Sequence, residues 1–308
     1  MAIGHFIKEI GRGKEGARAL SQSQAADMFG QILDGAVTDL EVGAFCIAMR
    51  IKGETPEEMC GFLEALHQRL TPVRISPTGP DCAAVVIPSY NGARKLPVLT
   101  PLLALLLARK GLPVLIHGTA TEDKRIGASE VLSALGITAQ STAEPLAKGQ
   151  VAFYPTALLH AGLQRLLDVR RVVNLRNPAH SLVKLMQPCE GPQVLVTSYT
   201  HPEYAVSMEQ VLCLRKSTAL LIRGTEGEAV ADPRRMPKMR CIQHGQLESE
   251  LEHQGGTLTS LPDLPPCDAQ STARYIQAVL DGTLPTPQPI AMQVEQIVRL
   301  AKIAGMPE

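Results

Sequence analysis

The sequence has no tryptophan, and aromatic residues make up only 3% of its 308 residues. The core must therefore be built mainly from aliphatic side chains and methionine. The same scarcity argues against a protein that stacks many bases of a nucleic acid on aromatic rings. Hydrophobic residues at 45% and charged residues at 19% are ordinary for a globular protein and argue against disorder.

Motifs of metal, disulfide and membrane proteins are also missing. The seven cysteines contain no C-x-x-C pair and their number is odd, so we expect reduced core thiols. The first ten residues include Lys8 and Glu9 and lack the apolar segment of a signal peptide. The longest apolar stretch, residues 98–108, is too short to cross a bilayer. The sequence therefore predicts a soluble cytoplasmic protein that does not contact a membrane.

The formal net charge is zero, but the charges are unevenly distributed along the chain. Residues 1–81 carry 8 basic and 11 acidic side chains, residues 82–243 carry 19 and 11, and residues 244–308 carry 3 and 8. A basic centre favours a phosphate-bearing ligand, because the local field acts on a ligand more than the total charge does. The alternative is that oppositely charged surfaces pair within a dimer.

Residues 1–71 have the pattern of a helical unit. Apolar residues recur at helical spacing after Ser21 and after the capping-box pattern at 38–41. A further helix is predicted to begin at Thr55-Pro56, where threonine caps the helix and proline takes its first position. The stretch 72–80, rich in proline, serine and threonine, predicts a hinge.

Beyond the hinge, apolar runs alternate with helical patterns, which predicts a mostly parallel central sheet flanked by helices. The expected strands are residues 83–87, 112–116, 151–153, 194–196, 219–222 and 239–242. Residues 157–186 are expected to be mainly helical, and the last helices to span 268–281 and 289–304. The alternating Glu248, Glu250 and Glu252 are expected to be solvated surface. The predicted fold class is α/β, with a small all-α domain and a large α/β domain.

Three segments carry a resemblance to a known family. Residues 31–59, with their R-I-K-G-E-T-P-E-E stretch, are similar to the N-terminal helical domain of anthranilate phosphoribosyltransferases and pyrimidine nucleoside phosphorylases. Residues 115–118 stand where that family has K-H-G-N-R, and residues 127–136 resemble its G-S-A-D-x-L-E-A-L-G helix. The resemblance extends over essentially the whole chain.

The resemblance implies a discontinuous domain organisation. The small helical domain would comprise residues 1–71 and about 160–188, and the large α/β domain residues 72–159 and 189–308. In this family the active cleft lies between the domains and homodimers form through the small domain. Both features are therefore expected here.

The motifs of the family's substrate pocket are altered in this sequence. Residues 88–92 replace the pyrophosphate loop G-T-G-G-D and keep only one of its glycines, so fewer backbone N–H groups can approach a phosphate closely. The pair His117-Gly118 either offers an imidazole at the end of a strand or is a structural turn. We take as the remnant of the pocket Ser89, Tyr90, Asn91, Gly92, His117 and Gly118. The paired acids that hold Mg²⁺ on the pyrophosphate are represented by Glu226 and Glu228, a weaker anchor than adjacent carboxylates.

Residues 170–185 resemble one branch of the family, the TrpD-like paralogues known as second anthranilate phosphoribosyltransferases. The branch implies a dimer with a basic groove between domains that binds nucleic acid without sequence preference. On one helix, residues 176, 180 and 184 would share a face and could follow phosphates along a backbone. The candidate contacts are Arg170, Arg171, Arg176, His180 and Lys184, and, on loops beside the same cleft, Arg94, Lys95, Lys124 and Arg125. The alternative for all of these charges is an ordinary solvated surface.

The sequence leaves two main functions open. The first is non-specific binding of nucleic acid, DNA or RNA, on a phosphoribosyltransferase-like scaffold. The second is a glycosyltransferase that moves phosphoribose from phosphoribosyl pyrophosphate to anthranilate or a related nitrogenous acceptor, with Mg²⁺ at Glu226 and Glu228. A third possibility is a dimer that serves only as a platform for other proteins.

Overall fold

The structure is a computed structural model, and it describes residues 3–76, 83–122, 124–257 and 261–306. Part of the expected hinge and Cys82 lie outside the described residues. The chain divides into two compact units, Met1–Thr71 with Thr156–Pro188 and Pro72–Pro155 with Cys189–Glu308. The chain thus returns to the helical unit at residue 156, where the sequence suggested about 160. Each unit is described by itself.

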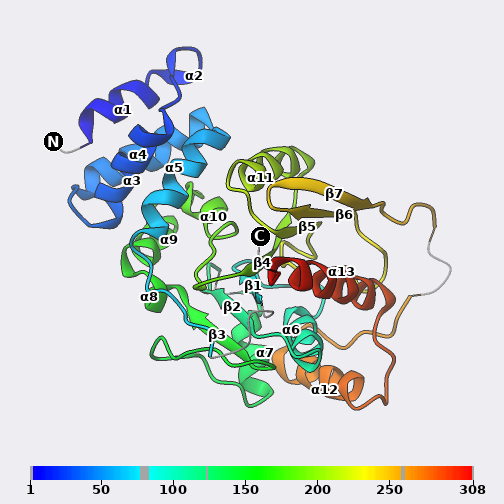
Figure 1. Ribbon diagram of the computed structural model, residues 1–308. Coiled ribbons are helices and arrows are strands. Elements are labelled where there is room, and N and C mark those ends of the chain that lie inside the picture. Colours follow the sequence, from blue (N-terminus) through cyan, green and yellow to red (C-terminus); the bar gives the residue numbers. More distant parts are fainter. Residues whose placement is uncertain (1–2, 77–82, 123, 258–260, 307–308) are drawn as a thin grey trace. The chain divides into compact units, whose positions relative to one another are not determined.

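The helical unit is built almost entirely of helices connected by short turns. Its helices are α1 (Gly4–Ile10), α2 (Gly13–Gly16), α3 (Gln22–Leu33), α4 (Asp39–Lys52), α5 (Pro56–His67), α8 (Thr156–Leu159), α9 (Ala161–Val173) and α10 (Ala179–Leu182). The helices α3, α4 and α5 begin with capping boxes at Ser21, Thr38 and Thr55. The sequence predicts the box at Thr38 and the helix starts at the other two positions. Helices α3 and α5 pack together, and α1 and α2 lie against α4 (Figure 1).

Phenylalanines and one buried ion pair hold the centre of this unit. The ring centroids of Phe29 and Phe62 lie 4.8 Å apart, and those of Phe45 and Phe62 lie 6.0 Å apart. The fully buried Glu58 accepts a hydrogen bond from the backbone of Leu20 and pairs with Lys52 at 2.5 Å. A buried carboxylate needs such partners, because charge without compensation is expensive to bury. Glu58, on α5, therefore ties the segment before α3 to the end of α4.

The segment 156–188 is mainly helical, as predicted, but it is divided into the helices α8, α9 and α10. Helix α9 ends at Asn174, which adopts a left-handed backbone conformation with φ of 56°. Pro178 then caps the short helix α10. Arg176 therefore lies between helices, so the prediction that residues 176, 180 and 184 share one helix face is wrong. Asparagine favours this helix end, and the proline directly before α10 has no backbone N–H group to continue a helix from α9.

A seven-stranded sheet forms the centre of the α/β unit. Its order is β3-β2-β1-β4-β5-β6-β7, with the first five strands parallel and the last two antiparallel. The strands are β1 (Ala84–Ser89), β2 (Val114–Gly118), β3 (Val151–Pro155), β4 (Gln193–Tyr199), β5 (Ala219–Arg223), β6 (Met239–Gln243) and β7 (Gln246–Leu251). The predicted fold class, a helical unit plus a mostly parallel α/β unit, is confirmed.

The edge strand β7 is absent from the sequence-based expectation. Glu248 and Glu250 are exposed, as expected, and they also pair with basic side chains: Glu248 lies 2.5 Å from Arg299, and Glu250 lies 2.5 Å from Lys238. The Lys238 hydrogen bond lowers the pKa of Glu250 to about 2. Alternation of glutamate with smaller residues is the period-two pattern of an edge strand, and charge protects such an edge from pairing with other chains.

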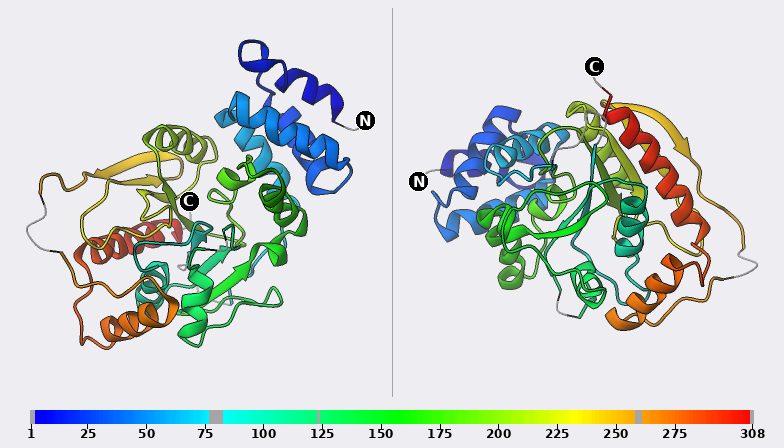
Figure 2. Two further views of the ribbon diagram at one scale, coloured as in Figure 1. Left: turned by 180° about the vertical axis from the view of Figure 1, so that it is seen from behind. Right: turned by 60° about the horizontal axis from the view of Figure 1, so that its bottom comes forward.

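Helices cover the sheet and complete its core. They are α6 (Thr100–Arg109), α7 (Ala128–Ala134), α11 (Pro202–Leu214), α12 (Ala269–Leu280) and α13 (Gln288–Ala304). Alternate residues of β1 to β6 share one hydrophobic cluster with α6, α7, α12 and α13, and Figure 2 shows α6 and α13 along the same face. Helix α11 packs against β4 and β5 outside this cluster. The carboxyl ends of the parallel strands are left to the connecting loops, where sites of open α/β sheets occur.

The structure bears on the question of membrane-spanning helices and on the cysteines of the described residues. No helix among them is long and apolar enough to cross a membrane. Cys46 and Cys189 are buried, and burial raises the pKa of both thiols to about 12. Both cysteines therefore remain neutral thiols at ordinary pH.

Candidate functional site

The ends of β1 and β2 are locked together at the site where the resemblance places the substrate pocket. Ser89 is paired with Gly118 across the two parallel strands. A Cβ atom at Gly118 would lie 1.9 Å from the carbonyl oxygen of Ser89, so only glycine fits there. Gly92 has φ of 60°, and a Cβ atom there would lie 2.6 Å from the carbonyl oxygen of Ile126. Both glycines therefore serve close backbone packing.

His117 and Tyr90 form a buried pair next to this joint. The Tyr90 hydroxyl lies 2.8 Å from His117 Nδ1, and the rings meet edge to face with centroids 5.5 Å apart. His117 is fully buried, and Tyr90 is 6% exposed. The geometry matches the structural alternative for His117, because its imidazole does not reach solvent.

Glu228 reaches into the loop after β1 and accepts four hydrogen bonds there. Its Oε1 accepts from the backbone N–H groups of Asn91 at 3.0 Å and Gly92 at 2.9 Å. Its Oε2 accepts from the hydroxyls of Ser89 at 2.6 Å and Thr100 at 3.1 Å. The side chain is buried, with 1% of the residue exposed. The carboxylate thus holds the donors that a phosphate-binding loop would present to its ligand.

Glu226 accepts hydrogen bonds from the next residues of the same loop. Its carboxylate accepts from the backbone N–H groups of Arg94 at 3.0 Å, Lys95 at 2.9 Å and Leu96 at 2.9 Å. Partial burial acts to raise the pKa of Glu226, but the three N–H groups outweigh it and the pKa is lowered. Glu226 and Gly227 form a tight turn with φ of 51° and 93°, which brings both carboxylates to one loop.

These contacts leave no backbone donor between Asn91 and Leu96 for a ligand. Between Asn91 and Leu96 the remaining N–H group, that of Ala93, donates to the carbonyl oxygen of Ile126 at 2.9 Å. Magnesium would have to bind carboxylate oxygens that already face N–H and O–H donors. The described part of the chain also contains no group of three or more His, Cys, Asp or Glu residues that could hold a metal. In this arrangement Glu226 and Glu228 do not fit the magnesium site that the resemblance implies.

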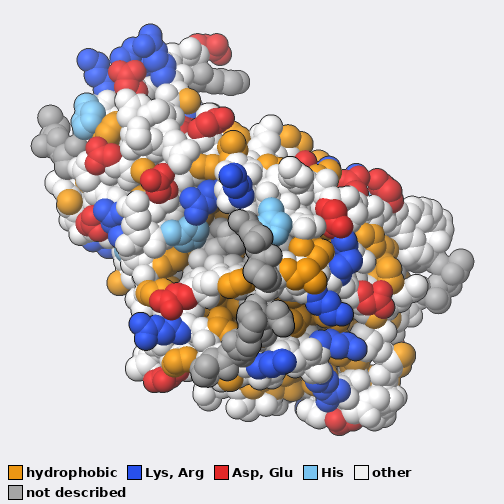
Figure 3. All heavy atoms as spheres, viewed as in Figure 1, with side chains coloured by type: hydrophobic (Ala, Val, Ile, Leu, Met, Phe, Trp, Pro, Cys, Tyr) orange, Lys and Arg blue, Asp and Glu red, His pale blue; other side chains and the backbone are white. Residues whose placement is uncertain are grey.

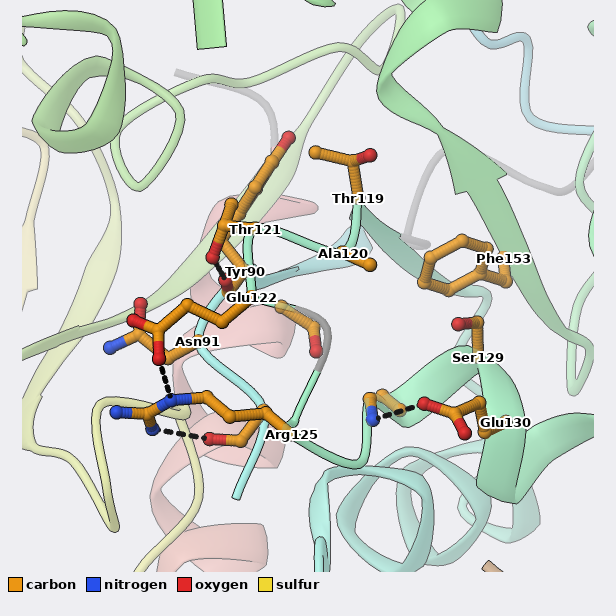
Figure 4. A pocket seen from close by; sticks show the side chains of 14 residues that line it. Tyr90, Asn91, Thr119, Ala120, Thr121, Glu122, Arg125, Ser129, Glu130 and Phe153 are labelled. Carbon is orange, nitrogen blue, oxygen red and sulfur yellow. Dashed lines mark hydrogen bonds and ion pairs between the residues drawn. The ribbon is translucent and has the colours of Figure 1, made fainter. Parts of the chain in front are cut away.

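A small pocket, partly open to solvent, lies beside the loop. It is lined by Ser89, Tyr90, Asn91, Gly92, Thr119, Ala120, Thr121, Glu122, Arg125, Gly127, Ala128, Ser129, Glu130 and Phe153. Arg125 pairs with Glu122 at 2.9 Å and donates to the carbonyl oxygen of Gly92, as Figure 4 shows. Across the pocket Glu130 accepts from the backbone of Gly127. With two carboxylates and one guanidinium, the lining does not favour a diphosphate.

The cations of the loops after β1 and β2 were predicted as contacts for nucleic acid, and most of them are exposed. Arg94 and Lys95 are exposed and follow Gly92, and their backbone N–H groups bind Glu226. Lys124 is exposed on the loop that also carries Arg125. Arg125 itself is directed to Glu122 and the backbone, which indicates a structural role in joining two loops.

The basic residues of segment 156–188 occupy four different local positions. Arg170 and Arg171 lie in the last turn of α9, where positive charge suits the carbonyl end of the helix. Arg176 follows in the turn, His180 lies in α10, and Lys184 comes after it. Arg171 is exposed and lies 3.5 Å from Asp168, the one acidic residue of the segment.

His180 does not add charge to this group at neutral pH. Burial, followed by the nearby charges of Arg176 and Arg170, lowers the pKa of His180 to about 4. Its Nδ1 lies 3.3 Å from both the backbone N and the carbonyl oxygen of Asn177, which tie the ring to the turn before α10. Within this segment, positive charge therefore comes from arginine and lysine.

Several basic residues of the α/β unit form ion pairs. Arg234 makes a two-pronged contact with Asp232 at 2.9 and 2.7 Å, and Lys238 pairs with Glu250. On the face drawn in Figure 3, the Lys and Arg side chains over α6, α12 and α13 form a loose row and no continuous patch. Segment 156–188 has five basic residues against one acidic residue.

Comparison with known proteins assigns the family. Residues 5–69 match the model described as "Glycosyl transferase family, helical bundle domain". The uncharacterized protein YbiB of Escherichia coli (strain K12) is 38% identical over 94% of this chain and 91% of its own length. The chain belongs to glycosyl transferase family 3 and is TrpD-like.

More distant relatives of this TrpD-like chain include named enzymes. The anthranilate phosphoribosyltransferase of Methylorubrum extorquens (strain PA1) is 28% identical over 86% of this chain and 79% of its own length. The crystal structure of the enzyme from Thermus thermophilus superposes with a TM-score of 0.70 at 21% identity, over 97% of this chain and 87% of that one. The Saccharomyces cerevisiae enzyme in complex with PRPP and Mg gives 0.66 at 14% identity, over 98% and 95%. These structures establish the fold of the TrpD-like chain.

The site contains residues that the sequence-based analysis missed. Thr100 at the start of α6 binds Glu228, and the backbone of residues 94–96 binds Glu226. A T-P pair that opens a helix after an apolar strand was the available signal for Thr100. Backbone donors carry no sequence signal, so the Glu226 contacts could not be predicted.

Proposed function

We propose that this TrpD-like protein binds nucleic acid, DNA or RNA, without sequence preference. The observation that carries the proposal is the charge of segment 156–188, which returns to the helical unit with five basic residues and one acidic residue. Such side chains gain affinity from phosphates by releasing counterions, which is independent of the base sequence. The basic groove between the domains stays a prediction of the resemblance.

The composition of the segment supports contact with the backbone of a nucleic acid and argues against contact with bases. It contains no phenylalanine, tyrosine or tryptophan on which bases could stack. Exposed Val172 and Leu175 lie between Arg171 and Arg176 and offer apolar contact for sugars. Phosphate contacts position a protein on a nucleic acid but carry little sequence information.

A salt titration of binding tests this function. With four cations of the segment contacting phosphates, affinity for duplex DNA measured by fluorescence anisotropy should fall on the order of 100-fold between about 50 and 200 mM salt. Single strands should show a shallower fall, roughly 50-fold. Oligonucleotides of equal length and scrambled sequence should bind equally. Absence of binding at about 50 mM salt would contradict the proposal.

Transfer of phosphoribose is the second candidate, favoured by the similarity to named anthranilate phosphoribosyltransferases. Against it stand the donors of the loop after β1, which are held by Glu226 and Glu228. Calorimetry with phosphoribosyl pyrophosphate and Mg²⁺ separates the two functions. We expect no saturable binding. Binding to the wild type that Glu228→Gln abolishes would favour the transferase, because Glu228 would then be a ligand of the magnesium complex.

We also propose a homodimer in the cytoplasm, formed through the helical unit. Helix α4 leaves Leu40, Ile47 and Ile51 exposed at helical spacing, an apolar stripe that the described residues of the chain do not cover. A dimer would double the number of cations that meet one nucleic acid. Light scattering should give twice the chain mass for the wild type, and the double variant Leu40→Glu/Ile51→Glu should give one chain mass.

A further inference from the structure

The loop after β1 has the geometry of an anion receptor. Two successive backbone N–H groups, of Asn91 and Gly92, point to one spot, and the positive φ of Gly92 gives the loop the concave form of an anion-binding nest. The hydroxyls of Ser89 and Thr100 complete a set of four donors. The anion that these donors meet is the carboxylate of Glu228.

We propose that the chain fills this anion site with its own Glu228 carboxylate and therefore does not take up free phosphate or diphosphate there. Glu226 fills the adjoining set of N–H groups in the same way. Without the Glu228 carboxylate, the loop becomes a site for small anions such as formate, acetate and inorganic phosphate. This inference is independent of nucleic-acid binding, because it concerns the α/β unit.

The turn that carries the two glutamates is held in place by contacts of its own. Ser198 Oγ donates to the carbonyl oxygen of Gly227 at 2.9 Å, and Thr225 Oγ1 donates to that of Val230 at 2.9 Å. A Cβ atom at Gly227 would lie 1.6 Å from Asn91 Nδ2, so the turn and the loop are in direct contact. Glu228 is therefore presented by a fixed turn and does not reach the loop as a flexible surface side chain.

A free anion and the carboxylate cannot occupy the site together. Both need the same four donors, and their like charges repel each other at hydrogen-bonding distance. Withdrawal of Glu228 would leave buried donors without acceptors, which is unfavourable unless the incoming anion satisfies all of them. Glu226, bound to the next three N–H groups, adds a second negative charge near the same position.

Chemical rescue of Glu228→Ala tests the proposal. We expect the thermal midpoint of this variant to lie roughly 10 °C below that of the wild type, because several buried donors lose their acceptor. Formate, acetate or phosphate should raise it by about 5 °C or more, saturably and above chloride at equal ionic strength. The wild type should show no such saturable shift.

Two matched variants separate refilling of the site from general stabilisation by salt. Glu228→Gln keeps the side-chain volume in the site and should show no saturable response to anions. Glu130→Ala removes a carboxylate that accepts from one backbone N–H group at the exposed start of α7, and it should not respond either. A response of Glu130→Ala equal to that of Glu228→Ala would overturn the proposal, as would no response of Glu228→Ala to any of the three anions.

The wild type provides a test that does not depend on the folding of a variant. Hydrogen exchange at the amides of Asn91 and Gly92 should be slow without ligand and unchanged by phosphate or pyrophosphate. Fast exchange that either anion slows would show that Glu228 does not hold these donors, and the proposal would be wrong. Salt-dependent binding of oligonucleotides would be unaffected by that result, so the two proposals fail independently.

Discussion

Two regions of the protein carry groups that can bind a phosphate. One is a set of hydrogen-bond donors in the α/β unit, and the other is a set of basic side chains in the helical unit. In the α/β unit, the donors of residues 89–96 face the carboxylates of Glu226 and Glu228. In the helical unit, segment 156–188 has a single acidic residue, Asp168, for five basic ones. If only the donors of the loop and the basic side chains of the segment are counted, the two regions are equally good candidates for a phosphate site. Because carboxylates already occupy the donors of the loop, the segment is the better candidate for binding phosphate.

Depth separates the two regions as well. His117 and Gly118 lie in the joint between β1 and β2, Glu228 binds the loop after β1, and all three residues are buried. Arg171 lies at the exposed end of α9. Substitutions in the first region should therefore act on stability, and substitutions in the second on ligand affinity. The expected sizes of these effects differ accordingly.

The largest effect is expected at Gly118. Gly118→Ala would place a Cβ atom 1.9 Å from the carbonyl oxygen of Ser89, and neither strand can move without breaking the pairing of β1 with β2. The free energy of unfolding should fall by more than about 3 kcal/mol. Urea denaturation measures the loss. Gly127→Ala is the matched control, because the nearest atoms to its Cβ lie at 3.6 Å, and it should change stability little.

The fold could be predicted from the sequence further than the site could. Capping boxes and apolar runs are local signals, so the helices at 22–67 and the parallel strands were predictable. The break after α9 has a sequence signal in Pro178, because proline interrupts a helix, but the spacing of residues 176, 180 and 184 favours the opposite prediction. In the structure the left-handed Asn174 ends α9, and a single asparagine is compatible with both outcomes.

The candidate site was predictable as a location and not as an arrangement. The altered motif at 88–92 and the acids Glu226 and Glu228 were identified from the sequence as parts of one pocket, and the structure brings them together. The sequence suggested that the two carboxylates bind a cation, whereas they bind backbone N–H groups. The same side chain serves both purposes, and only the direction of the neighbouring donors distinguishes them.

The second prediction concerns affinity for nucleic acid. Arg176→Gln/Lys184→Gln should lower the salt slope of oligonucleotide binding by about 2 and the affinity at about 100 mM salt roughly 10- to 50-fold. The matched control, Arg234→Gln/Lys238→Gln, removes an arginine and a lysine that are paired with Asp232 and Glu250. If this control weakens binding as much as the first variant, segment 156–188 is not the main contact for nucleic acid and the proposal is contradicted.

The smallest effect on binding is expected at His180, whose contribution to stability depends on pH. Because its pKa in the folded protein is about 4, against about 6.5 in an unfolded chain, the unfolded state binds the proton more readily between these values. The histidine therefore lowers the free energy of unfolding as pH falls from about 6.5 to 4, by roughly 1–3 kcal/mol.

His180→Gln removes this dependence, so its free energy of unfolding should fall less than that of the wild type between about pH 7 and pH 4. Denaturation at several pH values measures the difference, and the carboxylates shared by both proteins cancel in it. At about pH 7 the imidazole is neutral, so oligonucleotide affinity should stay within about twofold of the wild type. A tenfold loss at that pH would mean that His180 contacts the nucleic acid itself. It would then belong with Arg176 and Lys184 as a ligand contact and not with the structural core of its turn.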